Sequence, residues 1–292
     1  MSEFLKRIES GWLRLLSEAR AKTCWQAKTK ENGYAVRSGF LDRTVANLPD
    51  WADEIILPWD AEKLHKYGDF VRHNYWTDRG SINVFCVKGT EHPDYQGLTW
   101  LEFLFKGKFM DRNMQMMDRH PDYYLGTKAK KSGMYYNSYN GLDWYIGSDG
   151  NHRSALARVL FYDRQLTHLH GVTLNHYVFD DELLGAYRAL QGEVRRQPEA
   201  GYHWDLTSGT ELLSREETAG WRTDHFMPFL SLKLAFVTNG LPPDWKGVDH
   251  IRHAAQGWSV LRKLQDLRAN SRTSSSKTSE NFLQGPFNRR PE

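Results

Sequence analysis

The chain has 292 residues, of which 40% are hydrophobic and 13% aromatic, and its formal net charge at pH 7 is +3. This length and composition are typical of a globular protein with one large domain or two modest ones. Residues 261–292 carry seven Lys or Arg against three Asp or Glu, so residues 1–260 are close to neutral. Bulk charge therefore does not indicate nucleic-acid binding, although a local basic surface is compatible with it.

The cysteines and the apolar segments exclude several other classes. Cys24 and Cys86 are far apart and form no CxxC motif, which argues against a disulfide framework and a cysteine-based zinc site. The N-terminus has acids early and no continuous apolar segment, so a secretory signal is not expected. No apolar run approaches the roughly 20 residues of a membrane helix. We expect a soluble, cytoplasmic protein without a membrane partner.

The first half of the chain contains several short elements. Residues 3–22 repeat apolar side chains at helical spacing and predict an amphipathic helix that docks on the domain. Residues 53–59 predict a short strand ended by Pro58, residues 81–87 a second strand, and residues 99–109 a helix.

A hairpin is predicted over residues 134–147, where Asn140-Gly141 separates two aromatic-rich segments. This dipeptide is the sequence signal of a tight type I′ turn. In the second segment Leu142, Trp144 and Ile146 alternate with polar or aromatic neighbours, as in a half-buried strand. Residues 147–162 then predict a sharp loop and a helix, and residues 171–179 alternate again and predict a strand.

Beyond residue 180 the pattern is mainly helical, with helices expected over 180–196, 209–221 and 247–269. The last residues, 269–292, are polar and rich in serine, and they predict a disordered tail. The order of hairpin, loop, helix and strand before residue 180 indicates an α+β fold. We expect a helical C-terminal region over 184–268.

The loop over 147–154 carries the chemistry. Gly147 and Gly150 permit a sharp turn, and Asp149 or Asn151 can cap the helix that follows. The helix start has unsatisfied N–H donors and a partial positive charge. Arg153 adds a guanidinium suited to phosphate oxygens. These groups predict an anion site, with phosphate as its natural ligand.

Two readings of the same loop stay open on these grounds. His152 can donate or accept a proton near neutral pH, as a site requires. The loop can equally be an ordinary strand-to-helix turn with a capping acid, a core histidine and a solvated arginine. In either case Ala155, Val159 and Tyr162 form the stripe by which the helix packs on the sheet.

The sequence Asp149-Gly150-Asn151-His152-Arg153 resembles the D-G-x-H-R signature of the ParB/sulfiredoxin superfamily. The resemblance covers about residues 134–183 and extends back toward 53–58. It implies a mixed sheet with packed helices over 51–183, an N-terminal lead-in over 1–50, and a loop that holds a nucleotide or phosphate. Sulfiredoxins carry a catalytic cysteine where this chain has Asn151, so reductase chemistry is not expected.

Other members of the superfamily are partition proteins, which bind CTP and DNA, and ParB-like nucleases or ATPases. Partition proteins have an arginine-rich version of the motif followed by a helix-turn-helix, whereas this motif has one arginine. The resemblance therefore implies a ParB-like nuclease or NTPase acting on DNA or a nucleotide such as ATP or CTP. The alternative is a non-catalytic nucleotide- or DNA-binding regulator of partition or plasmid transfer.

The resemblance also implies roles for individual residues. Backbone N–H groups from Gly150 through Asn151 to Ser154, together with Arg153, would hold the phosphate and stabilise its charge. His152 would be the general acid or base. Asp149 would cap the helix, orient His152 or help to bind Mg²⁺ or another divalent cation, with capping favoured.

Three further segments have ordinary structural explanations. His168, His170 and His176 could ligate a metal, but the metal ligands stay unassigned and a core role is the default for His176. The acids of 180–182 could bind Mg²⁺, although acids at a helix start complement its dipole. Residues 202–209 could line a cleft or form a loop.

Overall fold

A computed structural model of the chain describes residues 43–44, 46–196, 202–236 and 244–271. The helix expected over 3–22, Cys24 and most of the expected tail lie outside these residues. Contacts divide the chain into two compact units. Unit 1 comprises the residues up to Ala61 together with Tyr75–His176 and Glu217–Arg222; unit 2 comprises Glu62–Asn74, Tyr177–Glu216 and the residues from Thr223 onward.

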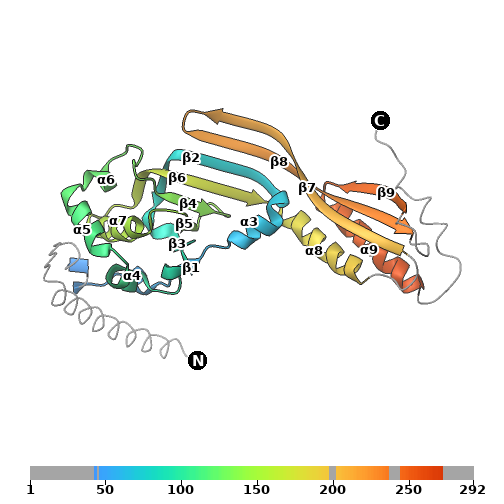
Figure 1. Cartoon of the computed structure of the whole chain (residues 1–292), viewed down its shortest axis with the longest axis horizontal. Helices are drawn as coiled ribbons and strands as arrows, with labels where there is room; N and C mark the ends of the chain where they lie inside the picture. The colour runs from blue at the N-terminus through green and yellow to red at the C-terminus, as the bar shows by residue number, and fades with distance from the viewer. Residues whose placement is uncertain (1–42, 45, 197–201, 237–243, 272–292) are drawn as a thin grey trace, which may run out of the picture. The chain divides into compact units, whose positions relative to one another are not determined.

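Unit 1 is built on a mixed sheet, as the α+β interpretation predicted (Figure 1). Its strands lie in the order β1 (Leu57–Pro58), β3 (Val87–Thr90), β5 (Trp144–Ile146), β4 (Tyr135–Ser138), β6 (His168–Phe179) and β2 (Val71–Asn83). β4 and β5 are antiparallel, whereas β1–β3, β3–β5 and β4–β6 are parallel pairs.

The helices of unit 1 are α4 (Trp100–Lys106), α5 (Met110–Arg119), α6 (Asp122–Leu125) and α7 (Asn151–Asp163). A capping box begins α4: Thr99 Oγ1 accepts from the Glu102 amide, and Glu102 accepts from the Thr99 amide. α7 contacts α4 and α5, and every residue from Ser154 to Phe161 is buried. Tyr162, expected on the packed stripe, is 39% exposed, and its ring lies edge to face with Trp51 near the end of the helix.

The hairpin over 134–147 is confirmed, but its turn is not type I′. Tyr136 pairs with Ile146, and five residues connect the strands. A type I′ turn needs positive φ at both central residues, and here only Gly141 has it, with φ +71°. Asn140 instead accepts hydrogen bonds through Oδ1 from the amides of Leu142 and Asp143, which shapes a wider loop and leaves Leu142 72% exposed.

Two other short elements differ from expectation. The predicted strand over 81–87 is interrupted by a 3-10 turn at Val84–Cys86, where the Asn83 side chain accepts from the Phe85 amide. That local hydrogen bond replaces a ladder bond and separates β2 from β3. β1 ends at Pro58 as expected but begins only at Leu57, and the proline is tolerated because β1 is the edge strand of the sheet order.

Unit 2 corrects the expectation of a mainly helical C-terminal region. Its elements are α3 (Ala61–Tyr67), α8 (Asp181–Arg195), β7 (Tyr202–Thr218), β8 (Trp221–Phe236), β9 (Asp244–Ile251) and α9 (Ala254–Ser271). β7 lies next to β8, β9 pairs with β8 in antiparallel fashion, and α8 packs on α9. Only α8 and the second part of 247–269 are helical as expected.

The leucines and glutamates of residues 209–221 gave no sign of a strand. In β8, Leu230, Leu232 and Leu234 are buried, and Ser231 and Ala235 are buried as well, so side chains on both faces of this strand are covered. Gly220, with φ +102°, joins β7 to β8, and a cross-strand ion pair of 2.6 Å links Arg215 Nε to Asp224 Oδ1. Strand pairing thus overrides the helical preference of residues 209–221 and extends into 202–209.

Candidate functional site

The loop between β5 and α7 is tied firmly to β4. The Gly147 amide donates to the Tyr135 carbonyl over 2.8 Å, and the Tyr135 amide donates to the Asp149 carbonyl over 3.2 Å. Gly150 has φ +111°, and a Cβ at this position would lie 3.2 Å from Met134 Cα. Both the left-handed backbone and the close approach require glycine here.

No side chain caps the first turn of α7, which corrects the expected capping by Asp149 or Asn151. Gly150 occupies the N-cap position, and the first turn contains no acid. Asn151 is buried and accepts from Thr90 Oγ1 over 2.5 Å, while Asp149 Oδ1 accepts from the Gly150 amide over 2.6 Å. The Asp149 side chain is thus bonded to the neighbouring Gly150 amide, and the Asn151 side chain to the distant Thr90.

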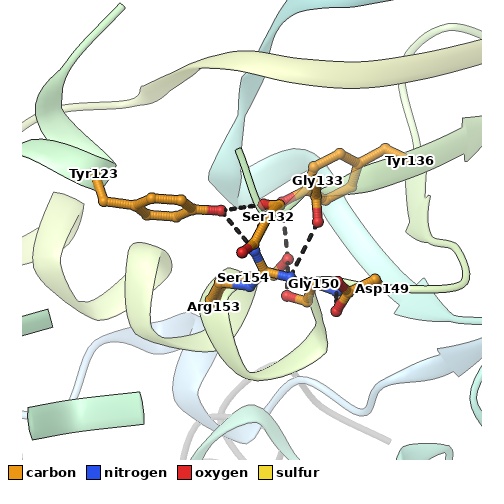
Figure 2. A network of polar contacts seen from close by, with 8 residues as sticks. All are labelled: Tyr123, Ser132, Gly133, Tyr136, Asp149, Gly150, Arg153 and Ser154. Carbon is orange, nitrogen blue, oxygen red and sulfur yellow. Dashed lines mark hydrogen bonds and ion pairs between the residues drawn. The ribbon is translucent and has the colours of Figure 1, made fainter. Parts of the chain in front are cut away.

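The amides of the loop are not equivalent. The Ser154 amide donates to the Gly150 carbonyl over 2.7 Å, and the Gly150 amide is bonded to Asp149. Ser154 Oγ is also buried and hydrogen-bonds Tyr136 Oη over 2.8 Å (Figure 2). Helical geometry leaves the amides of Asn151, His152 and Arg153 without an intrahelical acceptor. A helix start with such N–H groups carries a partial positive charge, which favours an anion.

Arg153 contacts protein groups rather than bulk solvent. Its side chain is 15% exposed, and Nη2 lies 2.7 Å from Asp149 Oδ2. Nη1 donates to Tyr123 Oη over 2.6 Å and to the Ser132 carbonyl, and Nη2 also donates to the Gly133 carbonyl over 3.0 Å (Figure 2). Burial acts to lower the pKa of Arg153, but Asp149 and Tyr123 outweigh it and raise the pKa, so the guanidinium stays charged.

His152 lies among aromatic side chains. Its ring centroid is 5.4 Å from that of Tyr95, edge to face, and 5.3 Å from that of Phe103. Burial is the main reason that its pKa is lowered, although the Lys108 backbone opposes the shift. His152 Nε2 is buried and has no hydrogen-bond partner among the described residues. The ring is therefore neutral near pH 7, with one nitrogen that no described group occupies.

Sequence reasoning did not single out Arg158, which fixes α7 to the core. The side chain is 1% exposed and donates to the Val87 carbonyl and to Glu54 Oε2, each over 2.8 Å. The guanidinium lies 5.0 Å from the Trp51 ring and 4.7 Å from the Trp100 ring. Burial lowers its pKa to about 10. No local spacing marks this role, because its partners come from distant segments.

The histidines and acids outside the loop have structural partners. His168 Nδ1 hydrogen-bonds Thr167 Oγ1 over 2.8 Å, and His170 Nδ1 hydrogen-bonds Ser81 Oγ over 2.7 Å. His176 is half-buried beside Trp144, and its buried Nε2 has no hydrogen-bond partner among the described residues. Within the described ranges, no group of three or more His, Cys, Asp or Glu is placed to hold a metal ion. Asp180 Oδ1 accepts from the Leu183 amide over 2.9 Å and caps α8, while Asp181 and Glu182 lie in its first turn, where acids complement the helix dipole as expected.

The fold is α+β, and the loop places Gly150 at the N-cap of α7 and the largely buried Arg153 in its first turn. No family model, curated protein or solved structure matches the chain. Among the described helices, none is long and apolar enough to cross a membrane.

Proposed function

We propose that unit 1 binds a phosphorylated ligand, a nucleotide or a DNA phosphate, at the start of α7. The observation that carries this proposal is the uncapped first turn: Gly150 precedes it, no side chain caps it, and it contains no acid. Its amides and the helix dipole favour an anion. The likeness of residues 149–153 to the ParB/sulfiredoxin signature supports a ParB-like assignment of the same loop.

Arg153 supports the proposal as a fixed positive charge in the first turn, and Asp149 modulates it. The Asp149 side chain is 59% exposed, so water or an anion can replace it at the guanidinium at small cost. The carbonyls of Ser132 and Gly133 hold the remaining N–H groups, which keeps the guanidinium beside the helix start when Asp149 is displaced. Arg153 thus contributes a fixed positive charge beside the helix start, and not a guanidinium free to bind a phosphate with two N–H groups.

A ParB-like nuclease or NTPase is the catalytic form of this proposal. It is favoured by the position of His152 in the first turn, because a neutral imidazole is the commonest general acid or base. Hydrolysis would also use a water and a divalent cation such as Mg²⁺. The non-catalytic form is a nucleotide- or DNA-binding regulator, and it needs only the loop amides and Arg153.

The test compares His152→Asp with His152→Asn, which differ by one charge in the first turn. Calorimetry with ATP, CTP and a short DNA duplex, with and without Mg²⁺, measures binding. We expect the aspartate variant to bind at least about fivefold more weakly, because like charges about 4 Å apart in water repel by about 1 kcal/mol. Equal affinities in two folded variants would refute the helix start as the phosphate site.

The catalytic and non-catalytic forms separate in a second assay. Cleavage of plasmid DNA and release of phosphate from ATP or CTP are followed with Mg²⁺ and with EDTA, in the wild type, in His152→Ala and in the His152→Ala/Arg153→Ala double variant. Turnover lost in His152→Ala with binding retained supports an enzyme. Binding by the wild type without turnover supports the regulator. Unchanged binding and turnover in a folded double variant would exclude the loop from both.

A further inference from the structure

The segment over 126–133, here called the basic strap, connects α6 to β4 and has the sequence GTKAKKSG. Three of its residues are lysines: Lys128, Lys130 and Lys131. In a chain whose first 260 residues are close to neutral, this is a local concentration of positive charge. The strap also supplies the two carbonyls that Arg153 contacts, so it lies directly beside the start of α7.

Hydrogen bonds and steric contact fix the strap backbone. The Lys130 amide donates to the Gly171 carbonyl of β6 over 2.9 Å. The Ser132 carbonyl accepts from Arg153 and from Tyr123 Oη, the latter over 2.6 Å (Figure 2). Gly171 has φ +70°, and a Cβ there would lie 2.1 Å from the Lys128 carbonyl oxygen. The strap therefore has a defined path against β6 and α7.

The three lysines differ in exposure: one is partly buried and two are exposed. Lys130 Nζ donates to the Gly126 carbonyl over 2.9 Å and lies 5.3 Å from the Tyr123 ring centroid, and burial lowers its pKa. Lys128 and Lys131 are exposed. The strap thus presents two exposed ammonium groups on a fixed backbone.

The charge and the length of this surface suit a polyanion. Asp149 pairs with Arg153, and Asp122 is the exposed acid in the first turn of α6, so the lysines leave an excess of positive charge around the helix start. The Cα atoms of Lys128 and Lys131 are at most about 10 Å apart, because each extended residue spans about 3.3–3.6 Å. A DNA strand carries one charge per about 3.4 Å of helix axis, so both lysines lie within the span of about three phosphates.

We infer that the basic strap is a contact surface for the phosphate backbone of DNA, which identifies the ligand of the α7 start as a nucleic acid rather than a free nucleotide. This inference rests on the proposed function. One backbone phosphate would occupy the amides of the first turn, and neighbouring phosphates would lie against Lys128 and Lys131. Arg153 is then a positioning residue that holds the strap beside the helix.

The test is the salt dependence of DNA binding by the full chain. Fluorescence anisotropy of a labelled duplex is measured between 50 and 200 mM salt for the wild type and for Lys128→Ala/Lys131→Ala. Each phosphate contact contributes about 0.9 to the slope of log K against log salt, so the double variant is expected to lower the slope by about two. Its affinity loss over this range becomes about tenfold smaller than that of the wild type.

A control variant removes the same charge elsewhere. Lys66→Ala/Arg262→Ala changes two exposed cations of unit 2 and is expected to keep the wild-type slope. A wild-type slope in folded Lys128→Ala/Lys131→Ala, or an equal loss in the control, would overturn the inference. Binding of the wild type to anionic phospholipid vesicles but not to DNA would do the same.

The two proposals fail in different ways. If His152→Asp binds more weakly than His152→Asn but the strap variant does not change the salt slope, the phosphate site stands and the strap inference fails. If His152→Asp and His152→Asn bind DNA equally while the strap variant lowers the slope, the helix start fails instead. Competition by ATP that displaces the duplex at equal affinity would also contradict a backbone ligand.

Discussion

Asp149 Oδ2 lies 2.7 Å from Arg153 Nη2, one helical turn further along the chain. The acid of the loop thus forms an ion pair with the arginine in the first turn of α7. Because the Asp149 side chain is 59% exposed, the pair contributes less than about 1 kcal/mol to stability. Under the proposed function, an incoming phosphate would compete with this carboxylate, so Asp149 would affect affinity more than folding.

Asp149→Asn is expected to strengthen binding of ATP or DNA about fivefold, because removal of one like charge near the phosphate is worth about 1 kcal/mol. Calorimetry at 50 mM salt measures the change. Asp163→Asn is the matched control, since Asp163 lies at the other end of α7 and pairs with Arg43 over 2.7 Å. Weaker or unchanged binding by Asp149→Asn would contradict competition at Arg153.

Arg158→Ala is expected to lower the free energy of unfolding by about 3 kcal/mol, through a cavity and a buried carbonyl left without its donor. The lost contacts are those to Val87 and to the rings of Trp51 and Trp100. Urea denaturation measures the change. Glu54→Gln is expected to cost less than about 1 kcal/mol, because the Glu54 side chain is 44% exposed. Equal losses would show that the ion pair, not the burial, dominates.

Stability is expected to fall as the pH drops below about 6.5, the pKa of an exposed imidazole. Burial lowers the pKa values of His152 and His176, so the unfolded chain binds protons over a range where the folded chain does not. Their contribution is complete above pH 6.5 and is lost below it. Urea midpoints from pH 5 to 8 measure this dependence, which His152→Gln/His176→Gln should flatten. An equally steep profile in that variant would assign the effect to other groups.

Gly171→Ala is expected to destabilise the fold by about 1–3 kcal/mol and to lower the salt slope of DNA binding, because the new Cβ displaces the basic strap. The strap would move because that Cβ and the Lys128 carbonyl cannot occupy the same space. Gly192→Ala is the control: it lies within α8 with no atom near its Cβ, so alanine should stabilise by about 0.5–1 kcal/mol. An unchanged slope in folded Gly171→Ala would separate the strap path from DNA binding.

Several elements follow from local patterns alone. The aromatic-rich segments around Asn140-Gly141 pair as a hairpin, and the apolar run after Gly150 forms α7. Residues 171–179 lie within β6, and Asp180 caps α8. Each of these signals depends on neighbours within one or two turns of the chain, so the spacing of the residues is sufficient.

Other features depend on partners that the folded chain supplies, near or far in sequence. Asp149 and Asn151 have the chemistry of helix caps, yet Arg153 and Thr90 bind their side chains instead. Residues 209–221 have helical composition, but pairing with β8 makes them a strand. The contact of Asn151 with Thr90, 61 residues away, is not predictable from local spacing.

Read alone, the amino-acid order was enough to locate the turn at Gly150, the helix behind it and the residues able to carry charge there. The partners of Arg153, the path of the basic strap and the burial of Arg158 arise only in the folded chain. Their physical cause is that hydrogen bonds and packing join Tyr123, Ser132 and Glu54 to α7 across long sequence separations.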